Sequence, residues 1–372
     1  MISTVITGHA KSEFALKFTL IPAQSLTAQH FAAWDAIQRA DPNLASPFFR
    51  PGFTLALAEV RPDIEVAILE QDDAVVGFFP FHRRRENVGL PVGGVISDYH
   101  GLVLQASVQL SVRELLRHCR LSAWHFDHLP AAQPAFSRHH WRQTCSPYID
   151  TSGGFEAYRA NRSAAGSKII SRTLQKQRKL QREVGPIRVE VMTREPRVLE
   201  TLMQWKSDQY RKSGVFDPFL SKSTRELFQN LLLRSDPAFC GVMSALYVNE
   251  QLAAVFYFLR SHRTAHAWST AYRQDLARYS PGSQLLLSTI QSASTLGIDR
   301  IDLGKGDERY KQSFMSGAVP LTEGSVDLRR GTRTLRHLWY CTRQWVRGSS
   351  LRRPLTGPWR WIKRELYRAQ FP

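Results

Sequence analysis

Two separate stretches of the chain have the same strand-turn-strand pattern, and this repetition restricts the possible folds more than any other feature. Residues 64–81 (IEVAILEQDDAVVGFFPF) alternate apolar and polar, turn at 71–73 and resume as an apolar strand. Residues 241–260 (GVMSALYVNEQLAAVFYFLR) repeat the pattern around a polar turn at 249–251, and a further strand is expected over 264–271. Each hairpin follows a helical, partly charged segment. The sequence therefore predicts two copies of one α/β unit.

The length of the chain agrees with two units. At 372 residues it exceeds the usual size of a single core, and its 43% hydrophobic content is that of a globular protein. Between the two hairpins the chain is interrupted by Ser146-Pro147 and Gly153-Gly154. The predicted domains are residues 1–150 and 151–328, followed by a basic, aromatic-rich tail over residues 329–372.

The net charge of +18 predicts an anionic partner, which could be nucleic acid, a membrane surface or a phosphorylated substrate. Nucleic acid is not expected, because no helix-turn-helix or zinc-finger signature accompanies the charge. Residues 167–184 are predicted to form an amphipathic basic helix with a solvated charged face. The tail, in which arginines alternate with tryptophans, suits peripheral contact with an anionic membrane, and packing of its tryptophans onto the domain is the alternative.

The cysteines and the N-terminus bear on the cellular compartment in which the protein is expected. The four cysteines are far apart and form no CxxC pair, so reduced thiols are expected rather than disulfides or a zinc ribbon. The N-terminus lacks a charged start followed by an apolar core, and no eighteen-residue apolar window follows. The sequence therefore predicts a cytoplasmic protein, with peripheral contact at the inner membrane through the tail.

Histidines and acids show no metal-binding spacing. Residues 89–101 (GLPVGGVISDYHG) gather Asp98, Tyr99 and His100, but a metal site would need further convergent ligands. Neither His125 nor His128 has a partner at a diagnostic spacing. No metal is predicted.

The segment YSPGSQLL suits an anion. Ser280, Pro281, Gly282 and Ser283 lead directly into an apolar-faced helix of about three turns, whose start contains no acid. The exposed amides and the positive end of the helix dipole favour a phosphate there. The alternative is an ordinary capped helix after a tight turn.

The segment DLGKGDERYKQSF, residues 302–314, is predicted to contain a strand end, a turn at 304–306 and a helix with Asp307 as its N-cap. Its spacing does not fit the phosphate loop GxxxxGK[ST], and the acids at 307 and 308 would repel a phosphate. The segment is therefore expected to present Asp307, Tyr310 and Lys311 to a substrate. The alternative for Asp302 is a structural, hydrogen-bonded acid, and for Asp307 simple capping.

A further cluster lies in WKSDQYRKSGVFDPF, residues 205–219. A helix ending at Gly214 would place Trp205 and Gln209 on one face and Lys206 and Tyr210 on a neighbouring face. Aromatic, amide and cationic groups together suit a sugar or another polar acceptor, and core packing is the alternative.

Together these segments resemble the CelD/BcsL-like branch of the GNAT acyltransferase superfamily, whose members are often linked to bacterial cellulose and other exopolysaccharide biosynthesis. The resemblance covers about residues 46–324. It is carried by YSPGSQLL, GIDRIDLGKGDERYKQSF and LQKQRKLQREVG in the second half, and by SPFFRPGF and VVGFFPFHRRRENVGLPVGGVISDYHG in the first. It implies an α/β (α+β) fold of tandem GNAT-like units, each with a mixed, mainly antiparallel sheet flanked by helices.

The resemblance also implies a site for acetyl-coenzyme A or a longer acyl-coenzyme A as co-substrate, without a metal. The acyl-coenzyme A would lie against the strand at 267–271 with its pyrophosphate at the following turn. The implied binding residues are Trp268, Ser269, Arg278, Tyr279, Ser280, Gly282 and Ser283. The sequence departs from the superfamily pattern Q/R-x-x-G-x-G/A, because Arg278 precedes Gly282 by one residue too many and Gln284 stands where a small residue is expected.

The predicted function is an acyl-coenzyme A dependent N- or O-acyltransferase that acts on a sugar, a lipid-linked sugar or another envelope-related acceptor. Asp302, Tyr310 and Lys311 are placed near the reaction centre, with Tyr310 as proton donor to the leaving thiolate. Two alternatives remain open. A Fem-type transferase would use aminoacyl-tRNA and bind it in a salt-dependent way, and a non-catalytic partner in polysaccharide biosynthesis would bind no thioester.

Overall fold

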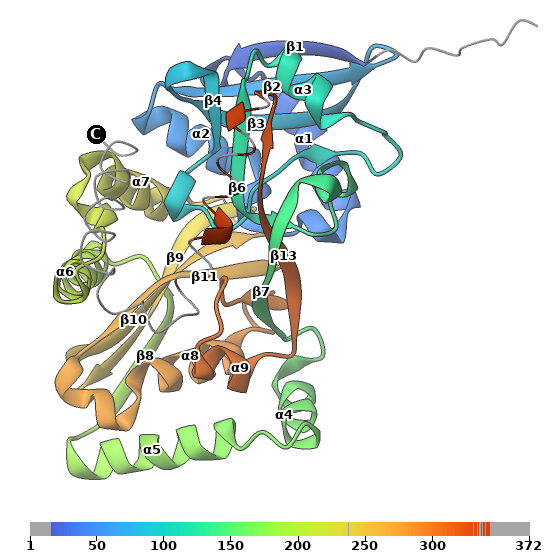
Figure 1. The fold of residues 1–372 in the computed structure, drawn as a ribbon. Helices are drawn as coiled ribbons and strands as arrows, with labels where there is room; N and C mark the ends of the chain where they lie inside the picture. The colour runs from blue at the N-terminus through green and yellow to red at the C-terminus, as the bar shows by residue number, and fades with distance from the viewer. Residues whose placement is uncertain are drawn as a thin grey trace, which may run out of the picture.

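The computed structural model describes residues 16–236, 238–329, 331, 332, 334, 336, 338 and 340–342. Its strands form one large mixed sheet with helices packed on it (Figure 1). The strands are β1 (Lys17–Pro22), β2 (Ile64–Gln71), β3 (Ala74–Arg83), β4 (Val88–Pro91), β5 (Val103–Leu104), β6 (Ala123–Pro130), β7 (His140–Asp150), β8 (Ile187–Thr193), β9 (Phe239–Val248), β10 (Gln251–Ser261), β11 (Thr264–Tyr272), β12 (Arg300–Asp302) and β13 (Gly317–Asp327). The α-helices are α1 (Ala28–Ala40), α2 (Pro51–Val60), α3 (Val112–His118), α4 (Gly154–Ala164), α5 (Ile169–Glu183), α6 (Pro196–Ser213), α7 (Lys222–Leu233), α8 (Pro281–Ser292) and α9 (Arg309–Phe314).

Both predicted hairpins are confirmed. The hairpin β2–β3 turns at Asp72 and Asp73, and β9–β10 turns at Asn249 and Glu250. All four residues have positive φ angles, between 49° and 60°. Two consecutive positive φ angles match the right-handed twist of the strands, and Asn and Asp tolerate them better than most other side chains. The strand expected at 264–271 is β11, and the expected basic helix is α5.

The sheet connects the two halves of the chain. Its order is β1-β2-β3-β4-β6-β13-β7-β12-β11-β10-β9-β8, with β5 paired to β3. The late strand β13 lies between β6 and β7, and β7 pairs on its other side with β12. Only β4–β6 and β11–β12 are parallel among the pairs described. The predicted mixed, mainly antiparallel sheet flanked by helices is therefore confirmed, whereas the domain limits at 150 and 328 stay a prediction.

The apolar core also crosses between the halves. One cluster of buried side chains contains Trp34, Phe53 and Phe78 from the first half together with Leu227 and Leu259 from the second. Because this cluster contains buried apolar side chains from both halves, its packing contributes to holding the halves together. Residues at the junction are therefore placed by both halves.

Other expectations concern the thiols, the membrane and the tail. Among the described residues, the four cysteines form no disulfide bond. Among the described helices, none combines the length and the apolar composition needed to cross a bilayer. The tail expectation falls mostly outside the described residues, including its tryptophans at 339, 345, 359 and 361, but Tyr340 packs on Trp141 with ring centroids 5.1 Å apart.

Gly241→Ala is expected to lower the free energy of unfolding by about 1–3 kcal/mol, because an added methyl group overpacks a full core. A Cβ atom at this position of β9 would overlap the Tyr257 hydroxyl, which donates to the Phe228 carbonyl at 2.9 Å. Gly282→Ala is the matched control, since its Cβ would meet only Tyr272 Cδ1 at 3.7 Å. Urea unfolding of both variants measures the difference, and equal stabilities would contradict the expectation.

Candidate active site

The pairing of β11 with β12 ends where polar groups from both halves meet. The two strands pair in parallel over 264–266 and 300–302. Immediately beyond, β11 has a bulge, because Ala267 and Ser269 pair with consecutive residues of β10 and leave Trp268 outside the ladder. A bulge next to the end of a pairing is a frequent feature of functional sites.

His266 is the centre of this polar group. Its buried side chain lies between two carboxylates, with Nε2 at 2.8 Å from Asp98 Oδ2 and Nδ1 at 3.3 Å from Asp302 Oδ1. Burial alone would lower the pKa of His266, but the Asp302 and Asp98 carboxylates outweigh it and raise the pKa to about 9. The imidazole is therefore cationic at neutral pH and links the two halves electrostatically.

The Asp302 carboxylate already accepts hydrogen bonds from several groups of the protein. Its carboxylate accepts hydrogen bonds from Ser146 Oγ at 2.6 Å, from Tyr99 Oη at 2.5 Å and from the Gly304 amide at 2.8 Å. Burial opposes its ionisation, but His266 and these donors outweigh burial and hold the pKa of Asp302 well below its usual range. A buried, ionised and saturated carboxylate is suited to orient His266 and the following loop rather than to take a proton from a substrate.

Two lysines hold the loop that follows Asp302. Lys311 is buried and donates to the carbonyls of Gly304 and Lys305 at 3.2 and 3.0 Å. Lys305 reaches the first half, where its ammonium lies 2.6 Å from the Asp127 carbonyl and 2.7 Å from Glu323 Oε1. Both lysines are thus engaged with the protein, and the geometry favours a positioning role for Lys311.

The position of α9 corrects one expectation. The helix begins at Arg309 with Glu308 as its N-cap, and no side chain caps it, so the prediction of Asp307 as the N-cap was wrong. The two glycines before it allow the loop to continue past Asp307, since Gly304 and Gly306 both have positive φ. Asp307 is exposed, one residue before the cap.

Tyr310 lies on the first turn of α9. Its ring is half-buried against the apolar cluster of the second half. Burial, with a smaller contribution from Glu308, raises the pKa of its phenol. Tyr310 therefore keeps its proton at neutral pH and is able to donate it.

The start of α8 receives a lysine from α5. Ser280 has a left-handed conformation with φ 56°, and its hydroxyl accepts from Lys176 Nζ at 2.7 Å. The amides of Ser283 and Gln284 bond to the Ser280 carbonyl, so two of the amides expected to face a phosphate are used within the turn. Space for a ligand remains at Gly282, where an added Cβ would contact only Tyr272 Cδ1.

Tyr279 and Gln284, on either side of the turn at 280–283, stabilise it through hydrogen bonds. The buried Tyr279 accepts from Arg278 at 2.6 Å and donates to Glu183 Oε2 at 2.9 Å, and its carbonyl accepts from Gln284 Nε2 at 2.9 Å. Gln284 is 1% exposed, so its side chain is directed into the protein and does not cover the helix start. The departure from the superfamily pattern at Gln284 therefore stabilises the turn instead of blocking it.

Trp268 is engaged between the halves. Its indole N–H donates to the Ile96 carbonyl at 2.6 Å, and its ring stacks on Phe228 with centroids 4.2 Å apart. Its ring therefore packs at the junction, and the contact of this side chain with a cofactor stays a prediction. Ser269 beside it is 9% exposed.

The cluster on α6 lies beside β11. Trp205 and Tyr210 are half-buried against the apolar residues between α6 and the sheet, and Lys206 Nζ lies 4.6 Å from the Tyr210 ring and 3.2 Å from Gln209 Oε1. Burial, with the charges of Asp217 and Asp98, raises the pKa of Tyr210 to about 12. The helix ends at Gly214, in a left-handed conformation, as predicted.

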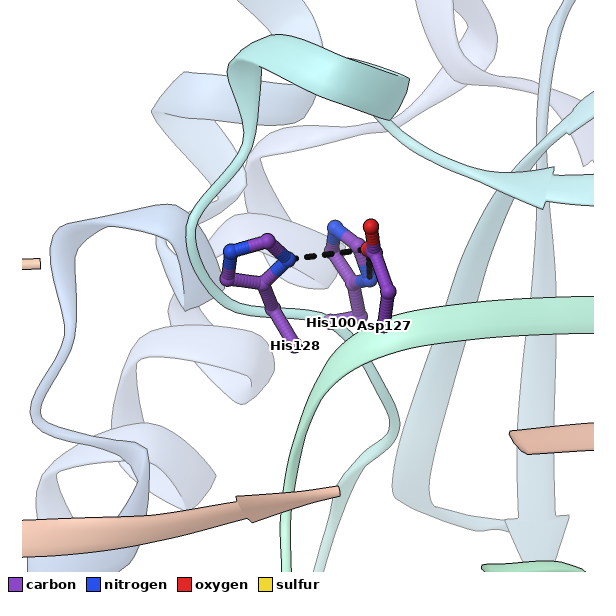
Figure 2. A group of neighbouring side chains, drawn as sticks. All are labelled: His100, Asp127 and His128. Atoms are coloured by element: carbon purple, nitrogen blue, oxygen red, sulfur yellow. Dashed lines mark hydrogen bonds and ion pairs between the residues drawn. The ribbon is translucent and has the colours of Figure 1, made fainter. Parts of the chain in front are cut away.

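A second polar group was missed from the sequence. His100, Asp127 and His128 lie together beside Asp98 (Figure 2). His128 Nδ1 is 2.9 Å from Asp127 Oδ1, and His128 Nε2 is 3.8 Å from Asp98 Oδ1. Sequence spacing could not indicate this group, because the neighbours of His128 come from another loop and from the adjacent residue.

Comparisons with known proteins agree with this fold. Residues 167–312 match the family model described as Acetyltransferase (GNAT) domain. The chain resembles the structure of FemX (10% identity, TM-score 0.55, 86% of this chain and 100% of that chain). It also resembles the C-terminal domain (DUF2156) of a protein named as a lysylphosphatidylglycerol synthetase from Agrobacterium fabrum (11% identity, TM-score 0.52, 84% of this chain and 95% of that chain). A conserved protein of unknown function from Bacteroides thetaiotaomicron is similar over 80% of this chain and 97% of its own (10% identity, TM-score 0.53). No curated protein matches the sequence.

Proposed function

We propose that the protein transfers an acyl group from acetyl-coenzyme A or a longer acyl-coenzyme A, because residues 167–312 match the family model of the GNAT acetyltransferase domain. The observation that carries this proposal is the start of α8, which follows β11 after the 3-10 helix Gln274–Tyr279 and combines Lys176, the Ser280 hydroxyl and an open position at Gly282. The CelD/BcsL-like branch stays a prediction from the sequence.

The pyrophosphate of coenzyme A suits this helix start. The positive end of the α8 dipole and the Lys176 ammonium both attract an anion. The first turn of α8 contains no acidic residue. The thioester would then extend along β11 towards the bulge at Trp268, with Ser269, Arg278 and Ser283 along its path.

In the proposed reaction, an amine or hydroxyl of the acceptor attacks the thioester carbonyl and the carbon–sulfur bond breaks. Tyr310 donates its phenolic proton to the departing thiolate, the attacking group releases its proton to solvent, and the Tyr310 phenolate regains a proton from solvent. We assign positioning roles to Asp302 and Lys311, which hold His266 and the loop at 303–306. Positioning of two bound reactants supplies much of the acceleration.

For the acceptor we propose a sugar, a lipid-linked sugar or another envelope-related molecule. The α6 residues Trp205, Lys206, Gln209 and Tyr210 support this, because Lys206 and Gln209 offer polar groups beside two aromatic rings. Their proximity to β11 would bring an acceptor towards the thioester. The exposed Asp307 would contribute from the loop of the second half.

Calorimetric titration with acetyl-coenzyme A and longer acyl-coenzyme A thioesters tests the proposal. We expect the native protein to bind acyl-coenzyme A. Gly282→Trp should bind it at least tenfold more weakly, because the indole would fill the open space at position 282 that we assign to the pyrophosphate. Lys222→Trp is the control, since this side chain is 84% exposed at the start of α7. Absence of binding to every thioester would overturn the proposal.

A Fem-type transfer from aminoacyl-tRNA is the second candidate. It is supported by the whole-chain similarity to FemX and by the exposed basic face of α5. It predicts tRNA binding that weakens steeply with salt, since each released counterion contributes to the slope. Binding of tRNA without binding of thioesters would favour this candidate, and binding of neither would favour a non-catalytic partner.

A further inference from the structure

We propose that His100, Asp127 and His128 form a binding site for a divalent transition-metal ion, with Zn²⁺ as the best match to the ligands. One ligand atom from each of the three residues lies within 4.8 Å of the others. The site is built by the first half of the chain and does not depend on the proposed acyl transfer.

The fold of β6 explains how two adjacent residues can serve one site. Consecutive side chains of a regular strand point to opposite faces. Here Leu129 pairs with Thr322 and Phe126 pairs with Gly324, so Asp127 and His128 together oppose one residue of β13. This bulge redirects the two side chains towards His100, with which they converge (Figure 2). The His100 amide also bonds to the His128 carbonyl at 3.0 Å, which fastens the loop to the bulge.

His100 presents a lone pair to a carboxylate. Its Nε2 lies 3.0 Å from the Ser97 carbonyl, which only accepts, so Nε2 carries the ring proton. In the neutral ring Nδ1 then bears a lone pair, and this atom is buried without a hydrogen-bond partner, 3.5 Å from Asp127 Oδ1. A buried lone pair that faces a carboxylate oxygen is unfavourable unless a proton or a cation lies between them. A bound metal ion would satisfy both.

His128 completes the arrangement. Its Nδ1 faces the same Asp127 oxygen at 2.9 Å. When a metal ion occupies Nδ1, the ring proton resides on Nε2, which faces Asp98 Oδ1 at 3.8 Å. Each histidine would then ligate through Nδ1 and direct its other N–H at a protein oxygen, Ser97 or Asp98. This combination of a ligating nitrogen and an oriented N–H is typical of metal-binding histidines.

The donor set indicates the class of metal. Two imidazoles and one carboxylate suit Zn²⁺ and its neighbours, which bind at about 2.0–2.2 Å, whereas Mg²⁺ and Ca²⁺ prefer oxygen ligands. The Asp127 side chain is 57% exposed, so solvent can supply a fourth ligand. The nearby Lys305 ammonium does not oppose the cation fully, because Glu323 Oε1 pairs with it at 2.7 Å.

The metal ion would also influence the junction of the halves. Asp98 Oδ1 lies 3.8 Å from His128 Nε2, and Asp98 Oδ2 lies 2.8 Å from His266 Nε2. Metal binding at His128 would thus fix the orientation of Asp98 and, through it, the His266 ring.

Titration of the untagged full-length protein with metal, after dialysis against a chelator, tests the proposal. We expect one equivalent of Zn²⁺ to bind by calorimetry, and one equivalent of Co²⁺ to give visible absorption bands from a site with nitrogen ligands. Asp127→Asn, which changes a half-exposed side chain and should fold, is expected to weaken Zn²⁺ binding at least tenfold, and His100→Ala and His128→Ala likewise. His118→Ala is the matched control, because this exposed ring stacks only on Phe18.

Two results would overturn the metal site. One is absence of stoichiometric Zn²⁺ and Co²⁺ binding by the folded native protein. The other is binding that Asp127→Asn leaves unchanged, or that His118→Ala weakens as much as the three ligand variants do.

Discussion

Tyr310→Phe is expected to lower kcat by a factor of about 10²–10⁴, the usual contribution of a positioned proton donor. The half-buried phenol is protonated at neutral pH, as it is at its ordinary pKa of 10, and burial raises this pKa further. Phenylalanine keeps the ring against the apolar cluster but cannot protonate the departing thiolate. We therefore expect the Kd for acyl-coenzyme A and the free energy of unfolding to remain within about twofold and about 1 kcal/mol of the native values.

Steady-state assays with acyl-coenzyme A and a panel of amine and hydroxyl acceptors measure this effect. Tyr247→Phe is the matched control, since Tyr247 is a half-buried tyrosine of β9 whose hydroxyl contacts Glu190 at 3.3 Å, at the β8 edge of the sheet. An unchanged kcat in Tyr310→Phe would remove Tyr310 from the chemistry. A loss of acyl-coenzyme A binding with unchanged kcat would assign it to binding instead.

His266→Gln is expected to lower the free energy of unfolding by about 3–5 kcal/mol, the cost of removing one partner from a buried ionic group. The variant leaves Asp98 and the buried Asp302 without the cation between them. Denaturant unfolding measures the loss, and His118→Gln at an exposed position should cost less than about 0.5 kcal/mol. Equal stability of the two variants would show that the His266 cation is not required.

The same group predicts a pH dependence with a defined sign. The pKa of His266 is raised from its ordinary value of 6.5 to about 9, so the protonated ring stabilises the fold. This contribution is complete below pH 6.5 and is lost as the pH rises through 9. The full stabilisation by the protonated ring is about 3 kcal/mol, since each pKa unit corresponds to 1.36 kcal/mol. This figure includes the His266–Asp302 interaction that also lowers the pKa of Asp302. The stability difference between the native protein and His266→Gln should therefore shrink from pH 6.5 to 9.5, and a constant difference would contradict the pKa shift.

Local patterns predicted the elements of the fold well. Alternation and polar turns placed both hairpins, and Ser280 to Ser283 placed the start of α8, because these signals depend on neighbouring residues. The N-cap of α9 was placed one residue too early, since two glycines let the loop run on. Tertiary packing decided the role of Trp268, whose environment is made by Ile96 and Phe228.

The polar centre could not be predicted in the same way. Asp98, Ser146, His266 and Asp302 are separated by many residues and meet only because strands of both halves lie side by side. The proposed metal ligands depend on a bulge in β6, which shows no sequence signal of its own. Spacing rules for ligands assume neighbouring residues of one element and therefore missed this group.

The position of β13 has a consequence for the order in which the protein can be made. This strand, residues 317–327, fills the place between β6 and β7, which the ribosome completes more than 160 residues earlier. A growing chain therefore carries the edges of β6 and β7 that face β13 without a partner until residues 317–327 have been synthesised, and such edges favour association with other chains. A premature stop before residue 317 would leave a product without the strand that joins β6 to β7, so the sheet that carries the site between the halves requires β13.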